Sequence, residues 1–74
     1  MDVPLISNLL RELRPQLEQN QFQAFAKFRE LEELLADSEV FAEITDIGRQ
    51  LRLMQFEAVL DRLTEIAKKQ DWTI

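Results

Sequence analysis

Apolar residues recur at spacings of three and four along almost the whole chain, and this periodicity constrains the fold more than any other feature. Such spacing places apolar side chains on one face of a helix and polar side chains on the opposite face. The chain also has only one glycine and two prolines, so it lacks the turn-forming residues that a β domain with many tight turns requires. We therefore expect an all-α fold.

Four amphipathic helices are predicted, over about residues 4–19, 21–36, 39–53 and 54–69. Asp2 and Pro4 suit the start of the first helix, and Pro15 predicts a kink that its apolar stripe crosses. Asp37 or Ser38 is expected to cap the third helix. The apolar stripes predict a core made of Ile6, Leu9, Leu10, Leu13, Leu17, Ala24, Phe28, Leu31, Leu35, Val40, Ile44, Ile47, Leu51, Phe56, Val59, Leu60, Leu63, Ile66 and Ala67.

Short connections between these helices favour an antiparallel up-down-up-down four-helix bundle in which residues 1–74 form a single helical domain. None of the helices would be stable alone, because each leaves one apolar face to be covered. A closed monomer is expected, with a pair of hairpins that opens and pairs with a second copy as the alternative. Gly48 borders the apolar stripe of the third helix, which predicts close approach of a neighbouring helix.

Two stretches of the chain resemble each other at an offset of 34 residues, namely residues 17–24 and 51–58. The match predicts one helix–turn–helix unit used twice, with Phe22 and Phe56 opening the second helix of each unit. The period equals that of tetratricopeptide repeats, but such arrays usually need at least three copies to bury a continuous core. We therefore interpret the match as pseudo-symmetry of a bundle, and keep a tetratricopeptide-like hairpin pair as an alternative.

The chain contains no histidine and no cysteine, which removes most catalytic and metal-binding chemistry. An imidazole base, a phosphohistidine, a thiol nucleophile, a disulfide and a cysteine- or histidine-based zinc site are all excluded. The few hydroxyl groups have no histidine to activate them. The acidic run is typical of a solvated helix face, so we expect no enzyme activity, no catalytic residues, no metal and no cofactor; this run comprises Glu30, Glu32, Glu33, Asp37 and Glu39.

Net charge and hydropathy limit the classes of partner and the cellular compartment that we expect for this chain. A net charge of −5 argues against nucleic acid, whose phosphates attract a basic face. No apolar stretch reaches the roughly 18 residues of a membrane span, and the first residues lack the basic region of a signal peptide. Together with the absence of cysteine, this pattern predicts a cytoplasmic protein that does not enter the membrane.

The second predicted helix carries side chains that its core stripe does not use. Phe22, Ala26 and Arg29 point away from the stripe, and Phe25 stands at its border. Aromatic residues beside arginine are typical of the residues that dominate binding energy in protein interfaces. We predict a partner-binding surface made of these four residues. The alternative is that Phe22 and Phe25 cover the end of the bundle against the first helix or against a tail containing Trp72 and Ile74.

This helix resembles the phosphoacceptor helix of histidine phosphotransfer domains from bacterial two-component signalling. Residues 21–32, QFQAFAKFRELE, follow the family's spacing of a polar residue, alanine, histidine, leucine and lysine, with Leu31 at the leucine and Arg29 at the histidine. The segments LRPQL at 13–17 and FEAV at 56–59 are similar to degenerate phosphotransfer-like segments at the C-termini of hybrid sensor histidine kinases.

Three departures from the family pattern decide what the resemblance implies. Arg29 replaces the phosphoacceptor histidine, Glu32 replaces the lysine and Glu33 replaces the glycine that usually follows. The resemblance therefore implies a four-helix bundle with a docking surface for a receiver or kinase domain, without phosphotransfer. We expect a non-catalytic interaction or regulatory domain of a two-component signalling protein. A helical docking or dimerisation module of a larger assembly is the alternative.

Overall fold

The computed structural model describes residues 2–72 and contains four helices in this range, with no strand. They are α1 (Val3–Glu18), α2 (Gln23–Leu34), α3 (Phe41–Arg52) and α4 (Phe56–Gln70). The all-α prediction is confirmed, and every helix end lies within two residues of its predicted position.

The start of α1 follows the sequence prediction. The Asp2 carboxylate accepts a hydrogen bond from the Leu5 N–H at 3.1 Å, and Pro4 lies in the first turn, where a missing N–H costs nothing. The helix continues through Pro15 to Glu18. Leu13 and Leu17 are buried on either side of that proline, so the apolar stripe crosses it as expected.

The connection between α2 and α3 is longer than predicted. The Ser38 hydroxyl accepts a hydrogen bond from the Val40 N–H at 3.3 Å, and the Ser38 carbonyl accepts one from the Phe41 N–H at 3.2 Å. Ser38 therefore organises a turn ahead of the helix instead of capping a helix that begins at residue 39. As a result α3 starts at Phe41 and has no side-chain cap.

The sequence match at an offset of 34 residues corresponds to the same helix ending in the α1–α2 and α3–α4 turns. Asn20 and Met54 both adopt left-handed backbone conformations, with φ of 55° and 64°. After each of them, the next N–H donates to a carbonyl five residues back: Gln21 to Gln16 at 2.8 Å, and Gln55 to Gln50 at 3.1 Å. The N–H of the left-handed residue itself donates to a carbonyl three residues back. Together these two hydrogen bonds form the Schellman motif that ends a helix.

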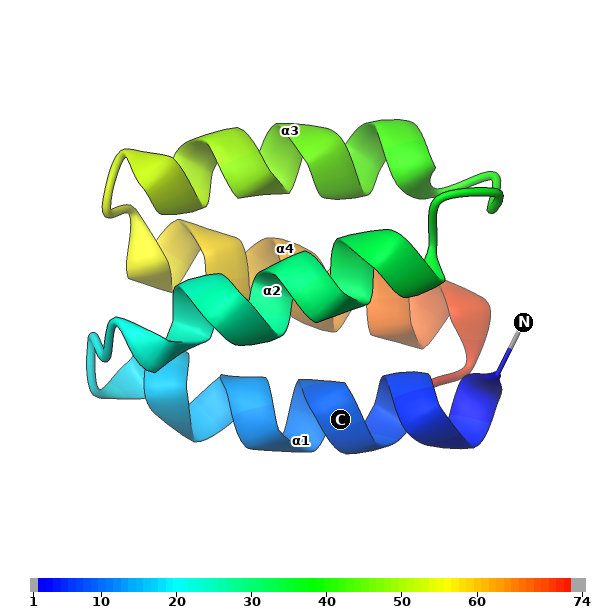
Figure 1. Ribbon diagram of the computed structural model, residues 1–74, viewed down its shortest axis with the longest axis horizontal. Coiled ribbons are helices and arrows are strands. Elements are labelled where there is room, and N and C mark those ends of the chain that lie inside the picture. The colour runs from blue at the N-terminus through cyan, green and yellow to red at the C-terminus, as the bar shows by residue number, and fades with distance from the viewer. Residues whose placement is uncertain (1, 73–74) are drawn as a thin grey trace.

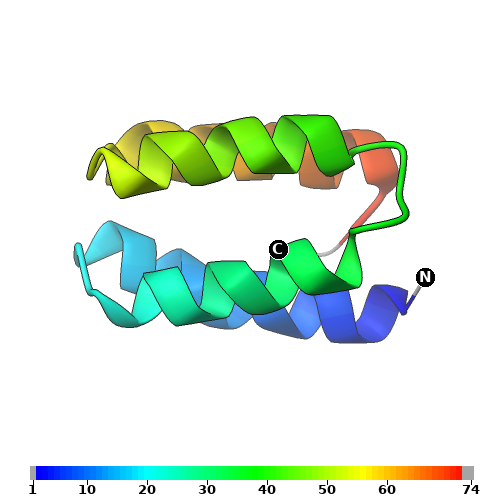
Figure 2. The ribbon, with the colours of Figure 1, turned by 45° about the horizontal axis from the view of Figure 1, so that its top comes forward.

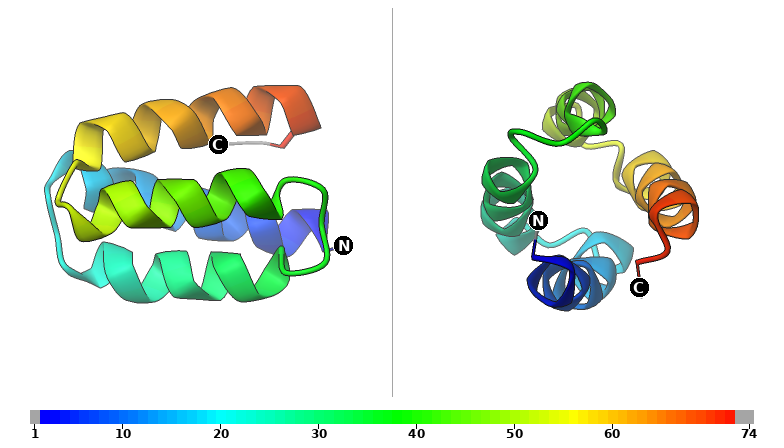
Figure 3. Two further views of the ribbon diagram at one scale, coloured as in Figure 1. Left: turned by 90° about the horizontal axis from the view of Figure 1, so that it is seen from above. Right: turned by 90° about the vertical axis from the view of Figure 1, so that its right-hand side faces the viewer.

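Each helix contacts two neighbours, so the four form a ring. Within residues 2–72, α1 packs on α2 and α4, and α3 packs on the same two helices. Figure 1 shows the α1–α2 and α3–α4 turns at one end of the molecule and the α2–α3 connection at the other. The two hairpins lie as layers in Figure 2, and the view along the helices in Figure 3 shows the ring. The α1–α4 contact joins the two hairpins, and these contacts are those of a helical bundle.

The core fills the centre of this ring. All the predicted core residues are buried except Leu60, which is half-buried and packs against the others. The radius of gyration is 10.8 Å, close to the roughly 11 Å expected for a compact chain of this length. Trp72 is also buried, and its backbone N–H donates a hydrogen bond to the Ala67 carbonyl at 2.8 Å. This part of the tail therefore folds back. Ile74, the other predicted tail residue, lies outside the described residues.

One ion pair braces each hairpin on its outside. Lys27 of α2 lies 3.0 Å from the Glu12 carboxylate of α1, and Arg62 of α4 lies 2.7 Å from the Asp46 carboxylate of α3. The two acids are 34 residues apart, which is the offset of the internal sequence match. The hydrogen bond from Lys27 to Glu12 raises the pKa of the lysine, and the hydrogen bond from Arg62 lowers the pKa of Asp46.

Candidate partner-binding surface

The outward side of α2 carries the four residues predicted to bind a partner, which we call the α2 face: Phe22, Phe25, Ala26 and Arg29. Phe22 is 70% exposed, and Ala26 and Arg29 are also exposed. Their spacing of four and three residues aligns them along one side of the helix. The structure therefore places three of the four side chains in solvent, next to one another along α2.

Phe25 has a mixed position. Its ring stacks on that of Phe22 with centroids 6.1 Å apart, and it meets the Phe56 ring of α4 edge-on at 6.2 Å. Phe25 is half-buried and packs against the core, and its ring contact is with Phe56 of α4, a neighbour that the alternative did not name. Phe22 remains largely uncovered, so the core accounts for Phe25 but not for Phe22.

Arg29 differs from the neighbouring cation in its electrostatic surroundings. Lys27 is held by Glu12 and also lies 3.7 Å from Glu30. Among residues 2–72, Arg29 has no carboxylate oxygen within 4.0 Å. A guanidinium offers a planar set of donors that matches a carboxylate or phosphate group. The donors of Arg29 are therefore available to a molecule outside the chain.

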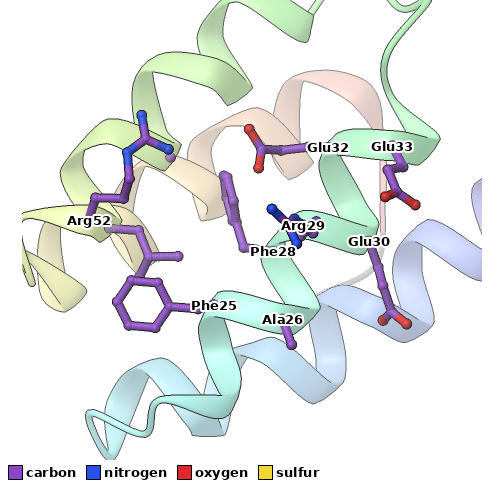
Figure 4. A pocket seen from close by; sticks show the side chains of 10 residues that line it. Phe25, Ala26, Phe28, Arg29, Glu30, Glu32, Glu33 and Arg52 are labelled. Atoms are coloured by element: carbon purple, nitrogen blue, oxygen red, sulfur yellow. The ribbon is translucent and has the colours of Figure 1, made fainter.

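A groove of about 490 Å³ runs between α2 and α3 beside this face (Figure 4). Gly48 of α3 makes its floor possible, because a Cβ atom there would lie 3.0 Å from Cε1 of the buried Phe28 ring. The predicted close approach of a helix to Gly48 is confirmed. The groove is lined by Phe25, Ala26, Phe28, Arg29, Glu30, Glu32, Glu33, Gly48, Leu51 and Arg52.

The sequence interpretation missed the contribution of α3 to this site. Arg52 lines the groove opposite the α2 face, and Glu32 lies partly buried with a carboxylate oxygen 3.3 Å from the Cβ position of Gly48. Gly48 itself was the available signal, since a glycine at the edge of an apolar stripe marks a close helix contact. Arg52 follows Gly48 by four residues and therefore lies on the same side of α3.

We next consider whether acidic side chains in the described part of the chain could bind a metal ion. Across residues 2–72, no three acidic side chains gather closely enough to hold a metal ion. The acidic run from Glu30 to Glu39 is mostly exposed, as predicted for a solvated face. In the same range, no helix combines the length and the apolar character that crossing a bilayer requires.

Comparisons with protein-family models, with curated proteins and with solved structures give no match to this chain.

Proposed function

We propose that this chain is a non-catalytic, phosphotransfer-like interaction domain, which binds a receiver or kinase domain of a cytoplasmic two-component signalling protein through the α2 face. In this proposal the four helices form an antiparallel up-down-up-down bundle, as in the phosphotransfer domains that residues 21–32 resemble. The bundle holds α2 rigidly and presents one side of it to the partner.

One observation carries the proposal: the α2 face combines an exposed aromatic ring with a guanidinium that no carboxylate of residues 2–72 pairs with. Phe22 is 70% exposed, and Arg29 has no carboxylate within 4.0 Å among residues 2–72. A buried arginine or aromatic side chain at the centre of an interface often accounts for most of the binding energy. In the unbound molecule neither group contributes to the core.

Arg29 gives the proposed complex its non-catalytic character. It occupies the position of the phosphoacceptor in the resemblance, and a guanidinium stays protonated, so it lacks the free nitrogen lone pair with which histidine takes up a phosphoryl group. A receiver active site is a cluster of acidic side chains, with which Arg29 would form a charge-assisted pair. The domain would then occupy that site without removing phosphate from it.

The test is a titration of the chain with isolated receiver domains from the same genome. We expect Arg29→Glu to weaken binding at least about tenfold, because it replaces an attractive charge with a repulsive one. The free energy of unfolding should change by no more than about 0.5 kcal/mol, as for other exposed positions. Phe22→Ala should weaken binding in the same way.

Arg14→Glu is the control, since Arg14 is an exposed arginine of α1 that follows Glu12, the residue paired with Lys27 of α2, by two positions and so lies on the other side of α1. This variant should bind receivers like the wild type. The proposal is wrong if Arg14→Glu and Arg29→Glu weaken binding equally, or if no receiver binds. Incubation with a phosphorylated receiver should also leave no acid-labile phosphate on the chain.

A second candidate function is docking within a larger assembly through the end of the bundle. The observation that favours it is an exposed pair in the α3–α4 turn, with Leu53 63% exposed and Met54 48% exposed. Leu53→Ser combined with Met54→Ser would abolish such docking and leave receiver binding unchanged. The same double variant therefore separates the two candidate functions.

A further inference from the structure

We infer that the groove between α2 and α3 is self-complementary, and that it pairs two copies of this chain through a two-fold contact in which the α2 helices run antiparallel. The two bundles stay closed, so the contact joins complete domains and leaves their cores unchanged. The pair therefore differs from a dimer of opened hairpins.

The charges that line the groove carry this inference. Arg29, Arg52, Glu32 and Glu33 all line it, and among residues 2–72 none of them has an oppositely charged side chain within 4.0 Å. The two ends of the groove carry opposite charges: Figure 4 shows Arg52 beside Phe25 at one end and Glu33 at the other, with Arg29 and Glu32 between them.

Rotation by 180° about an axis across the groove exchanges its two ends. The basic end of one copy then faces the acidic end of the other, and the reverse contact is identical by symmetry. A two-fold interface requires a surface that is complementary to itself in this way. The exposed side of α2 also fits a helix contact, because three residues of the α2 face, Phe22, Ala26 and Arg29, and then Glu33 follow one another at spacings of four, three and four residues.

The charge order on α2 is unfavourable for the isolated helix. Its first turn has no acid and its last turn has no base, whereas α3 and α4 have acids first and bases last. Negative charge is favoured near a helix N-terminus and positive charge near its C-terminus. Lys27 and Arg29 precede Glu30, Glu32 and Glu33, so the order on α2 is reversed. In an antiparallel pair, this same reversal places opposite charges against each other.

The net charge opposes association but does not prevent it. Each copy carries −5, and the repulsion acts between molecules about 20 Å or more across. At 0.15 M salt the Debye length is about 8 Å, so repulsion over that distance is largely screened, whereas charges in direct contact are not. We therefore expect a weak dimer that forms at high protein concentration.

The experiment uses two variants of opposite sign in sedimentation equilibrium at 0.15 M salt. In the acidic variant, Arg29→Glu and Arg52→Glu take the net charge from −5 to −9; in the basic variant, Glu32→Lys and Glu33→Lys take it from −5 to −1. Each variant should self-associate at least about tenfold more weakly than the wild type, because like charges now meet. An equimolar mixture should form a one-to-one dimer.

The basic variant makes the test selective. General repulsion is smallest at −1, so association governed by net charge would strengthen in this variant, and that result would overturn the inference. A wild type that remains monomeric at about 1 mM, or a mixture that remains monomeric while the wild type dimerises, would also overturn it. If either double variant fails to fold, the pair Arg29→Glu and Glu33→Lys replaces them, since both residues are exposed.

This inference is independent of receiver binding, although the two contacts share Arg29. A chain that dimerises in the charge-swap experiment but binds no receiver contradicts only the proposed function. A chain that binds receivers as a monomer in that experiment contradicts only the dimer. If both contacts form, they compete for Arg29, and receiver binding should weaken as the concentration of the chain rises.

Discussion

Two single residues show how this chain manages without the usual glycines at its turns. Asn20 and Met54 adopt the left-handed conformation at equivalent helix ends. Asparagine tolerates this conformation because its short polar side chain bonds locally, whereas most other residues pay about 1–2 kcal/mol for it. The Schellman hydrogen bonds are formed in both turns, so they and the packing of the helices offset the conformational energy of the left-handed Met54.

We predict that Met54→Gly stabilises the chain by about 1 kcal/mol, because it removes the Cβ strain at a left-handed position. Met54 is 48% exposed, so little packing is lost. Asn20→Gly should give a smaller gain at the equivalent site. Urea denaturation measures both. Equal gains, or a destabilised Met54→Gly variant, would contradict this explanation.

Gly48 presents the opposite case, since a larger residue there is predicted to harm the fold. Alanine would normally stabilise a helix interior by about 1 kcal/mol over glycine. At Gly48 its Cβ would lie 3.0 Å from the ring of Phe28, which is buried and has little room to move. We predict that Gly48→Ala fails to stabilise the chain and that Gly48→Val destabilises it by about 1–3 kcal/mol. A thermal unfolding series with Ala42→Gly as the exposed α3 control tests this balance.

At the scale of the helix, the braces and caps differ from element to element. The helix α1 has its Asp2 cap, while α2, α3 and α4 begin without side-chain caps. α3 and α4 carry charges that suit the helix dipole, and α2 does not. Packing of its buried side is therefore what holds α2 in place.

We predict a pH dependence from the brace between α3 and α4. The hydrogen bond from Arg62 lowers the pKa of Asp46 below its ordinary value of 3.8, so the stabilisation that this bond gives is fully present above that value. The stabilisation is lost as the pH falls through the lowered pKa. The difference in unfolding free energy between wild type and Asp46→Asn should therefore be constant near neutral pH and shrink below about pH 3.8.

The matching variant is Arg62→Gln, which removes the partner of Asp46. In this background, the effect of Asp46→Asn on the acid side of the stability profile should shrink without vanishing, because Arg49 still lies 3.5 Å from the Asp46 carboxylate. A difference that persists unchanged in the Arg62→Gln background would show that another group perturbs the Asp46 carboxyl.

The sequence predicted the elements well because helical periodicity is a local property. The stripes of Leu13, Leu31, Ile47 and Leu63 identified the buried side of each helix, and all four residues are buried. The helix ends were less well predicted. The left-handed turn at Met54 depends on backbone hydrogen bonds, which cannot be read from the residue types in the sequence.

Of the candidate surface, the sequence predicted the part that lies on a single helix. The angular positions of Phe22, Ala26 and Arg29 on α2 follow from their spacing, and all three are exposed. The contribution of Arg52 requires knowing which helix packs beside α2 and in which register. Which helices pack together is a property of the tertiary structure, and Gly48 was the sequence signal that indicated a close helix contact.

The whole molecule depends on one continuous core. We predict that Leu31→Ala and Leu63→Ala each destabilise the chain by about 2–5 kcal/mol, because both side chains are buried among residues of other helices. Unfolding followed by circular dichroism should remain a single transition, and chelators should not shift it. A transition in two steps would indicate that the hairpins fold separately.

We propose that the outer side of α2 binds a partner, while its inner side builds the core. The most direct measurement is an amide NMR titration of the labelled chain, at a concentration below self-association, with a receiver domain that binds it. We predict that the largest shift changes lie over residues 22–33 and around Gly48 and Arg52, with α1 and α4 little affected. Changes centred on Leu53 and Met54, or spread evenly over the chain, would contradict the claim.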